Sequence, residues 1–142
     1  MDREILFRGK DDSGIVNYDW LYGSLNNTDP QFPQIMYCDR FWNVCSVIVT
    51  PETIGQYTGL KDKNGRKIFE GDIVKGCSKS YKKNYLCEVY FNENMCHYGL
   101  TINRGSYTKH QTHDWLELTK TKASKLEVIG NIYDNPELLE GL

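Results

Sequence analysis

Alanine is almost absent from this sequence: Ala123 is the only one among 142 residues. The chain has ten isoleucines, ten tyrosines, nine threonines and seven valines. Alanine is the strongest helix former, whereas β-branched and aromatic side chains suit a pleated sheet. Long hydrophobic runs are also missing, because stretches such as residues 47–49 are far too short to cross a bilayer. The composition therefore predicts an all-β protein with short helical turns only, and it excludes membrane-spanning and coiled-coil proteins.

A strong excess of either charge is missing as well. The formal net charge is −2 at pH 7, which argues against a protein that coats nucleic acid through bulk electrostatics. The distribution is uneven, since residues 61–85 carry eight Lys or Arg and three acidic residues. The first ten residues are charged where a secretory signal needs an apolar core, so we expect a cytoplasmic protein. Five cysteines in a reducing compartment predict buried thiols rather than disulfides.

Short runs of strand-forming residues alternate with turn residues along the whole chain, without a long linker or an internal repeat. We therefore predict a single domain over residues 1–142, with many short strands of the kind that form barrels or coiled sheets. The predicted strands cover residues 4–9, 15–25, 35–38, 44–49, 73–74, 85–91, 98–103, 115–118 and 126–133. Helix is expected only as one turn after Thr50 and as a terminal helix over residues 136–140.

The densest local signals lie in residues 56–75. Asn64 and Gly65 tolerate the positive φ values of a tight turn and have strand-forming flanks, which predicts a hairpin. Gly71 allows an unusual backbone angle, and the Asp72 carboxylate next to it can accept backbone N–H groups before the next strand begins.

Three sequence blocks together resemble the YopX family of phage and prophage proteins. They are residues 3–10 (REILFRGK) with 20–23 (WLYG), residues 53–65 (TIGQYTGLKDKNG) with 68–74 (IFEGDIV), and residues 128–138 (VIGNIYDNPEL). The resemblance implies a mostly β protein of coiled sheets around an SH3-like barrel, assembly into homo-oligomers, and a phage or prophage origin. It implies no activity and no site residues.

The sequence departs from the pattern of that family in two places. Residues 16–19 are extra residues ahead of Trp20, which more often follows the first turn directly. Residues 77–113, a stretch that is normally variable, hold three of the five cysteines and all three histidines.

Thiolates and imidazoles are natural zinc ligands, so we consider a metal site first. The candidate ligands are Cys87, Cys96, His97, His110 and His113. No Cys-x-x-Cys pair is present, which favours buried thiols and exposed loop histidines over a metal site. We expect no metal and no other cofactor.

Catalytic signals are weak throughout the chain. Asp11 and Asp12 fall in a turn, and Glu70 and Asp72 flank a glycine where an acid has a structural role. None of the thiols is marked as activated by a particular histidine. No P-loop, dinucleotide fingerprint or Gly-x-Ser-x-Gly is present. We therefore expect a protein that is not an enzyme.

The best binding signal is a basic and aromatic loop. It contains Lys79, Tyr81, Lys82, Lys83 and Tyr85. Ammonium groups can contact phosphates and rings can stack on bases, which indicates nucleic acid as a ligand. Three phosphate contacts give a salt slope of only about −2 to −3, so a solvated hairpin tip is the favoured alternative.

Four aromatic residues form a second set of candidates: Trp20, Tyr22, Trp42 and Trp115. Aromatic side chains line ligand pockets and partner surfaces, but in a small β fold they belong more often to the core, and we favour the core here.

We predict a phage or prophage accessory protein that acts as a non-enzymatic binding module. Its ligand is a host protein or a small anionic signal, with a counter-defence role. The predicted binding residues are Trp20 and Tyr22 together with the residues of the basic and aromatic loop. The alternatives are a nucleic-acid-binding module that uses this loop, and a structural phage subunit. Membranes are not among the expected partners.

Overall fold

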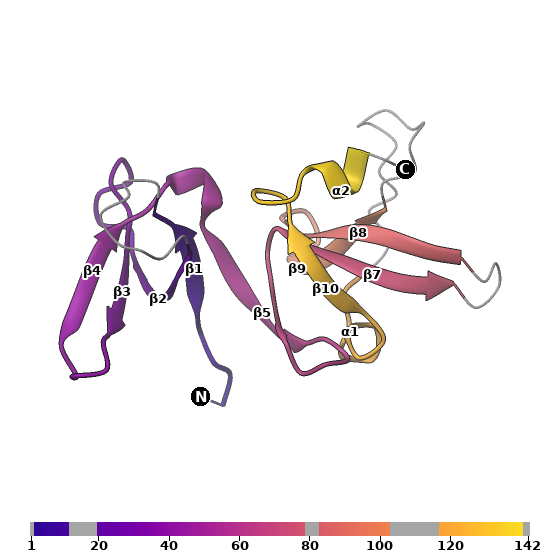
Figure 1. Ribbon diagram of the computed structural model, residues 1–142, viewed down its shortest axis with the longest axis horizontal. Helices are drawn as coiled ribbons and strands as arrows, with labels where there is room; N and C mark the ends of the chain where they lie inside the picture. Colours follow the sequence, from indigo (N-terminus) through magenta and orange to yellow (C-terminus); the bar gives the residue numbers. More distant parts are fainter. Residues whose placement is uncertain (1, 12–19, 79–82, 103–116, 141–142) are drawn as a thin grey trace. The chain divides into compact units, whose positions relative to one another are not determined.

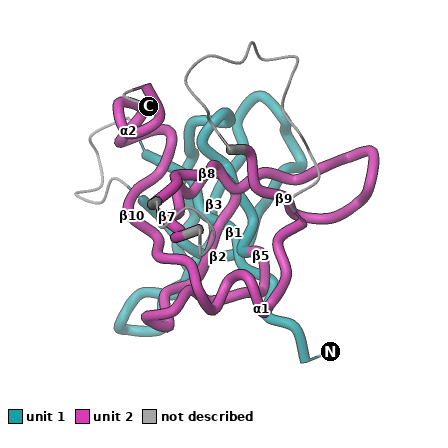
Figure 2. The backbone as a smooth tube through the Cα atoms, turned by 90° about the vertical axis from the view of Figure 1, so that its right-hand side faces the viewer, with its two compact units in different colours: residues 1–57 teal, residues 58–142 magenta. Residues whose placement is uncertain are grey.

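The computed structural model describes residues 2–11, 20–78, 83–102 and 117–140. Contacts group the chain into two compact units, residues 1–57 (unit 1) and 58–142 (unit 2), which Figure 2 colours separately. Each unit has its own cluster of buried hydrophobic side chains. The prediction of one domain over residues 1–142 stays a prediction.

Unit 1 is built on an antiparallel sheet in which β1 to β4 pair in chain order and β5 returns to pair with β1 (Figure 1). Its elements are β1 (Phe7–Lys10), β2 (Trp20–Asn26), β3 (Gln34–Cys38), β4 (Val44–Ile48), the single-turn helix η1 (Pro51–Thr53) and the start of β5 (Gly55–Lys61). The order β4-β3-β2-β1-β5 makes β4 an edge strand. The predicted strands 35–38 and 44–49 and the predicted turn after Thr50 are confirmed within a residue.

The unit 1 core lies on one face of this sheet. Leu21, Ile35 and Val49 are at most 5% exposed. Gly9 is opposite Leu21 in the register, and a Cβ atom on Gly9 would lie 2.6 Å from Cγ2 of Val49. Because side chains alternate along a strand, the neighbours of these residues project to the opposite face.

Unit 2 holds a four-stranded antiparallel sheet in the order β10-β7-β8-β9, together with the end of β5. Its further elements are β6 (Lys67–Phe69), β7 (Asp72–Ser78), β8 (Lys83–Asn92), β9 (His97–Ile102), α1 (Lys120–Ala123), β10 (Glu127–Asn131) and α2 (Glu137–Glu140). The buried side chains of its core include Ile68, Val74, Val89, Leu100 and Leu126. The predicted hairpin at Asn64 and Gly65 is confirmed, because β5 and β6 flank it and Gly65 has a φ of 79°.

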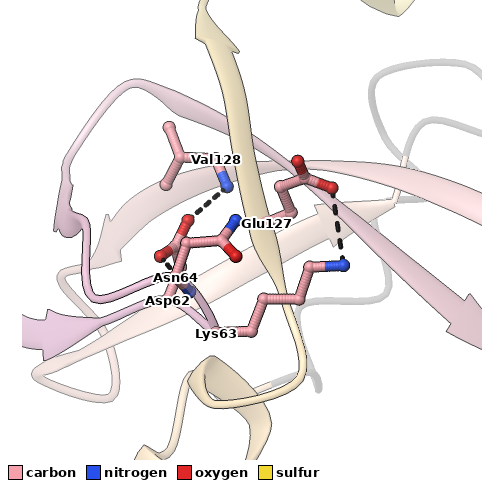
Figure 3. A network of polar contacts seen from close by, with 5 residues as sticks. All are labelled: Asp62, Lys63, Asn64, Glu127 and Val128. Atoms are coloured by element: carbon pink, nitrogen blue, oxygen red, sulfur yellow. Dashed lines mark hydrogen bonds and ion pairs between the residues drawn. The ribbon is translucent and has the colours of Figure 1, made fainter.

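Asp62 fixes this hairpin to β10 (Figure 3). One carboxylate oxygen accepts the N–H groups of Asn64 and Arg66, each at 2.9 Å, and the other accepts the N–H of Val128 at 2.9 Å. Burial by itself raises the pKa of Asp62, but the three backbone donors outweigh it, so the pKa lies below its ordinary value. Lys63 adds an ion pair to Glu127 at 3.5 Å.

The bend before β7 confirms the expectation for Gly71 and Asp72. Gly71 has a φ of 85°, which few residues other than glycine adopt. Asp72 is 2% exposed, and its carboxylate accepts the N–H of Phe69 at 2.8 Å. The acid therefore has the structural role that the sequence indicates.

Helix α1 corrects the expectation that helix occurs only after Thr50 and at residues 136–140. The Thr119 hydroxyl accepts the N–H of Lys122 at 3.2 Å and caps the first turn. Ala123 is 1% exposed and packs in the unit 2 core. A single turn is too short to show an amphipathic period, so hydrophobic periodicity does not predict α1.

The mostly β class with short helical turns is confirmed. Among the described residues the strands form two antiparallel sheets, and the pairings close neither of them into a barrel. The predicted strand over 115–118 lies mainly outside the described residues, although Glu117 forms a bridge with Gly99.

Candidate binding face

The β1–β2 hairpin of unit 1 places two cationic and two aromatic side chains on the sheet face opposite the core. Arg8 is opposite Tyr22 and Lys10 is opposite Trp20 in the register. Residues directly opposite each other share a face. We call these four residues, Arg8, Lys10, Trp20 and Tyr22, the outer face.

The outer face contains a cation–π contact. The guanidinium carbon of Arg8 lies 4.7 Å from the centroid of the Trp20 ring. Arg8 is 4% exposed, Trp20 is half-buried and Tyr22 is 47% exposed. A desolvated contact of this kind contributes about 2 kcal/mol. The stack therefore holds Trp20 in place beside an accessible tyrosine ring.

A second exposed group occupies the turn between β3 and β4, residues 39–43, which we call the aromatic turn. Phe41 is 68% exposed and Trp42 is 87% exposed. The guanidinium carbon of Arg40 lies 4.9 Å from the centroid of the Phe41 ring. Trp42 has a φ of 65°, the left-handed region that a bulky residue rarely adopts.

Asp39 holds the aromatic turn in this conformation. Its Oδ1 atom accepts the N–H of Phe41 at 2.8 Å and that of Asn43 at 3.0 Å. The Trp42 N–H reaches the Asp39 carbonyl at 3.1 Å. The hydrogen bond from the Asn43 backbone is the main reason that the pKa of Asp39 lies below its ordinary value. The rings are thus presented from an ordered turn.

The structure brings two of the predicted binding residues together and leaves most of the others untested. Trp20 and Tyr22 lie on the same face of β2. Lys79, Tyr81 and Lys82 fall outside the described residues, as does Trp115 among the aromatic candidates, and Lys83 is described only by its backbone in β8.

Tyr85 packs partly against the unit 2 core, opposite Gly76. A Cβ atom at Gly76 would lie 2.4 Å from the Tyr85 ring, so the glycine makes room for it. Burial raises the pKa of the Tyr85 hydroxyl.

The expectation that the aromatic candidates belong to the core is wrong for Tyr22 and Trp42, which are both exposed, and Trp42 is the most exposed of the large hydrophobic side chains described. Trp42 follows the polar residues Asp39 and Arg40, which are typical of a turn, and it lies at a hairpin tip. These polar residues indicate a turn, whereas the expectation of a core position rests only on the general preference of aromatic residues for cores.

The cysteines give a mixed result. All five lie among the described residues, and none of them forms a disulfide. Only Cys87 is buried, and burial raises the pKa of its thiol to about 12, so it is unreactive at neutral pH. The expectation of buried thiols is wrong for Cys38, Cys77 and Cys96, which are exposed, and for Cys45, which is half-buried. Cys38 and Cys45 belong to a hairpin at the sheet edge, where less chain covers them.

The candidate metal ligands do not gather within the described residues. His97 lies in β9, and its Nδ1 atom is 3.0 Å from the Tyr98 carbonyl oxygen. The Cys96 thiol contacts the Glu93 carbonyl at 3.6 Å. His110 and His113 lie outside the described residues, and the described part of the chain has no group of three metal-ligating side chains.

Sequence reasoning missed Arg8, Phe41, Val44 and Ile48. Arg8 alternates with core positions in β1, which was the available signal. The sequence predicts Val44 and Ile48 only as strand residues, yet both are more than half exposed. Their exposure depends on which face of β4 packs inward, which the short pattern VCSVI does not settle.

The fold and this face define a mostly β protein of two compact units that presents aromatic side chains from one sheet. None of the helices among the described residues is long and apolar enough to span a membrane.

The chain belongs to the YopX protein family, whose model matches residues 7–140. It is 32% identical over 78 residues to the SPbeta prophage-derived uncharacterized protein YopX of Bacillus subtilis (strain 168). That match covers 55% of this chain and 54% of the relative, so the matched region spans about half the length of each.

The crystal structure of protein EF1440 from Enterococcus faecalis is similar to this structure, with a TM-score of 0.54. The similarity covers 97% of this chain and 99% of that chain at 22% sequence identity. At this identity the likeness shows the fold alone.

Proposed function

We propose that this protein is a non-enzymatic binding module of prophage origin that docks a host protein through the outer face. The observation that carries the proposal is the Arg8–Trp20 stack beside the exposed Tyr22 ring. We place this action in the cytoplasm of the bacterial host, where it serves as counter-defence.

The chemistry of the outer face suits a protein partner. Arg, Trp and Tyr are the residue types that carry most of the binding energy in protein interfaces. Trp20 is already held by Arg8, so less side-chain freedom is lost when a partner binds. Tyr22 offers a large contact area, and its side chain has few rotatable bonds.

The test compares wild type with Tyr22→Ala. Phe91→Ala is the matched control, because Phe91 is a 41% exposed aromatic residue on β8 of unit 2. Each tagged protein is purified from the bacterial host, the protein that copurifies with wild type is identified by mass spectrometry, and the pair is reconstituted from purified components. We expect Tyr22→Ala to bind the reconstituted partner about 30-fold more weakly, and Phe91→Ala to bind it like wild type.

Equal binding by wild type and Tyr22→Ala would contradict the proposal. Native mass spectrometry of wild type separates the other ligand class. A small anion that remains bound in place of a protein would favour the sequestration of an anionic signal, with Arg8 and Lys10 as the cationic residues. Multiple turnovers of any substrate would end the non-enzymatic assignment.

The nucleic-acid alternative remains a prediction from the basic and aromatic loop. Replacement of Lys79, Lys82 and Lys83 with Glu then abolishes a salt-sensitive gel shift. An unshifted wild type at low salt would end this alternative. A structural phage subunit would instead copurify with virions.

We also propose that unit 2 has the SH3-like barrel that the resemblance implies. The support is that the β5–β6 hairpin is bonded to the chain around β10: the Lys63 N–H donates to the Leu126 carbonyl at 2.9 Å, and the Val128 N–H donates to Asp62. Self-association of the chain into a homo-oligomer is likewise part of the proposal.

A further inference from the structure

Strand β4 is an edge strand that lacks the usual protection against pairing. Its sequence, VCSVI, contains no charged residue, no proline and no glycine. It lies at the end of the sheet order, so one of its edges has no strand partner among the described residues. Edge strands of this kind are templates for another strand, and proteins normally protect them with lysine, proline or bulges.

Strand β10 of unit 2 shows what a protected edge looks like. Its register with β7 shifts between Val128 and Gly130, and it carries the charge of Glu127. Asp62 accepts the N–H of Val128. Strand β4 therefore lacks the bulge and the charge that protect the edge at β10.

Exposed hydrophobic side chains concentrate next to the unprotected edge. Nine large hydrophobic side chains are exposed among the described residues, and five of them belong to residues 32–48. These five are Phe32, Phe41, Trp42, Val44 and Ile48. Concentrated apolar exposure marks an interaction surface.

We propose that β4 pairs with β4 of a second copy of this chain, antiparallel and centred on Ser46. This register places Ser46 opposite the partner's Ser46, and Val44 opposite the partner's Ile48. Cys45 then faces the partner's Val47. Every cross-strand pair is uncharged, so no like charges meet, and the exposed apolar residues cover each other. The strand is thus complementary to itself.

The same arrangement gives Trp42 a role. In an antiparallel pair the start of one β4 lies beside the end of the other, so the aromatic turn extends toward the partner's Pro51. Trp42 keeps a left-handed backbone while the residue is 87% exposed, so the strain brings it no buried position among the described residues. Strained residues of this kind are typical of binding sites. The inference rests on the homo-oligomer of the proposed function and names its interface, and it does not depend on which ligand the outer face binds.

The test is a charge swap at Ser46. Ser46 is exposed and its hydroxyl donates to the side-chain oxygen of Gln34, so a charged residue there does not enter the core. We expect wild type to self-associate in sedimentation velocity measured over a range of protein concentrations. Ser46→Lys alone and Ser46→Glu alone each raise the self-association Kd about tenfold or more, because like charges meet at the centre of the register. An equimolar mixture of the two variants restores the complex.

Ser24→Lys is the matched control. Ser24 is exposed, lies on β2 opposite Met36, and is two strands from the edge, so this variant is expected to associate like wild type. Circular dichroism of each variant confirms that the fold is kept. A wild type that stays monomeric at all concentrations overturns the proposal. So does a Ser46→Lys protein that associates like wild type, or a mixture of the charged variants that fails to reassociate.

Discussion

The aromatic turn of unit 1 and the β5–β6 turn of unit 2 have the same backbone design. Each spans five residues, 39–43 and 62–66, and begins with an aspartate. In each, the aspartate N–H donates to the carbonyl of the fifth residue, at 2.9 Å and 2.8 Å, and the N–H of the fourth residue donates back, at 3.1 Å and 3.0 Å. In each, one aspartate oxygen also accepts the N–H groups of the third and fifth residues.

The two turns differ at the fourth residue, where the backbone is left-handed. Gly65 has a φ of 79° and Trp42 a φ of 65°. Glycine adopts this region without strain, whereas other L-residues lose about 1–2 kcal/mol there. Unit 2 therefore uses the turn for stability, and unit 1 keeps a costly residue in an exposed position. The pairing of β4 with a second copy, as proposed above, would give this exposed residue a role.

The largest effect is expected at the aspartate of unit 2. Asp62→Ala removes three backbone hydrogen bonds and leaves the N–H of Val128 without its acceptor, so the free energy of unfolding falls by about 3 kcal/mol. Urea denaturation measures this loss in the free energy of unfolding. A loss no larger than that caused by Asp39→Ala would show that the bond to β10 adds nothing, and the comparison between the turns would fail.

The dependence of stability on pH in the acid range gives a control for the role of Asp62. Its pKa is lowered in the folded protein, so the unfolded chain binds a proton more readily and stability falls as the pH drops from the ordinary value toward the folded pKa. Above the ordinary value the contribution is fully present. Asp62→Ala should therefore show a weaker loss of stability than wild type as the pH falls below the ordinary aspartate value of 3.8.

The next effect is at the left-handed residue of unit 2. Gly65→Ala adds a Cβ atom that meets nothing within 4 Å, so no packing contact changes. Backbone strain of about 1–2 kcal/mol is partly offset by about 0.5–1 kcal/mol, because alanine has less freedom than glycine in the unfolded chain. We expect a loss of about 1 kcal/mol, read from urea denaturation. Gly65→Asn is the matched control and should lose less, because asparagine tolerates this conformation better than other residues. An unchanged stability for Gly65→Ala would remove the claim that positive φ is costly at this position.

Sequence alone predicted the unit 2 turn and missed its counterpart for a physical reason. Asn64 and Gly65 carry turn chemistry in their side chains, so the hairpin follows from local preferences. Trp42 has no preference for a left-handed backbone. Its conformation is imposed by Asp39 and by the pairing of β3 with β4, which are properties of the folded chain.

The outer face shows the same limit of what the sequence can predict. Trp20 and Tyr22 were identified from residue type, but Arg8 joins them only through the register of β1 with β2. The alternation of β2 puts Leu21 in the core and Tyr22 outside. Which of these two faces is covered depends on residues distant in sequence, such as Val49 against Gly9, and no short pattern contains that information.

A smaller effect of opposite sign is expected at Trp42. Trp42→Gly releases backbone strain of about 1–2 kcal/mol and loses about 0.5–1 kcal/mol to the greater freedom of glycine in the unfolded chain. We expect a net gain in stability of about 0.5 kcal/mol, measured by urea denaturation in the Ser46→Lys background so that self-association does not contribute. In the otherwise wild-type protein, which keeps Ser46, Trp42→Gly should weaken self-association. A loss of stability would mean that Trp42 serves the fold, and the contrast with Gly65 would disappear.

The smallest effect is expected at the aspartate of unit 1. Asp39→Ala removes the side-chain acceptor of Phe41 and Asn43, but both N–H groups lie in an exposed turn and water replaces it. Global stability should change less than for any variant above, while hydrogen exchange at Phe41 and Asn43 becomes faster. Asp39→Asn keeps an acceptor oxygen and should restore slow exchange. If Asp39→Ala instead lowers stability as much as Asp62→Ala, the aromatic turn is a structural clamp like its counterpart, and its exposed rings need no partner to explain them.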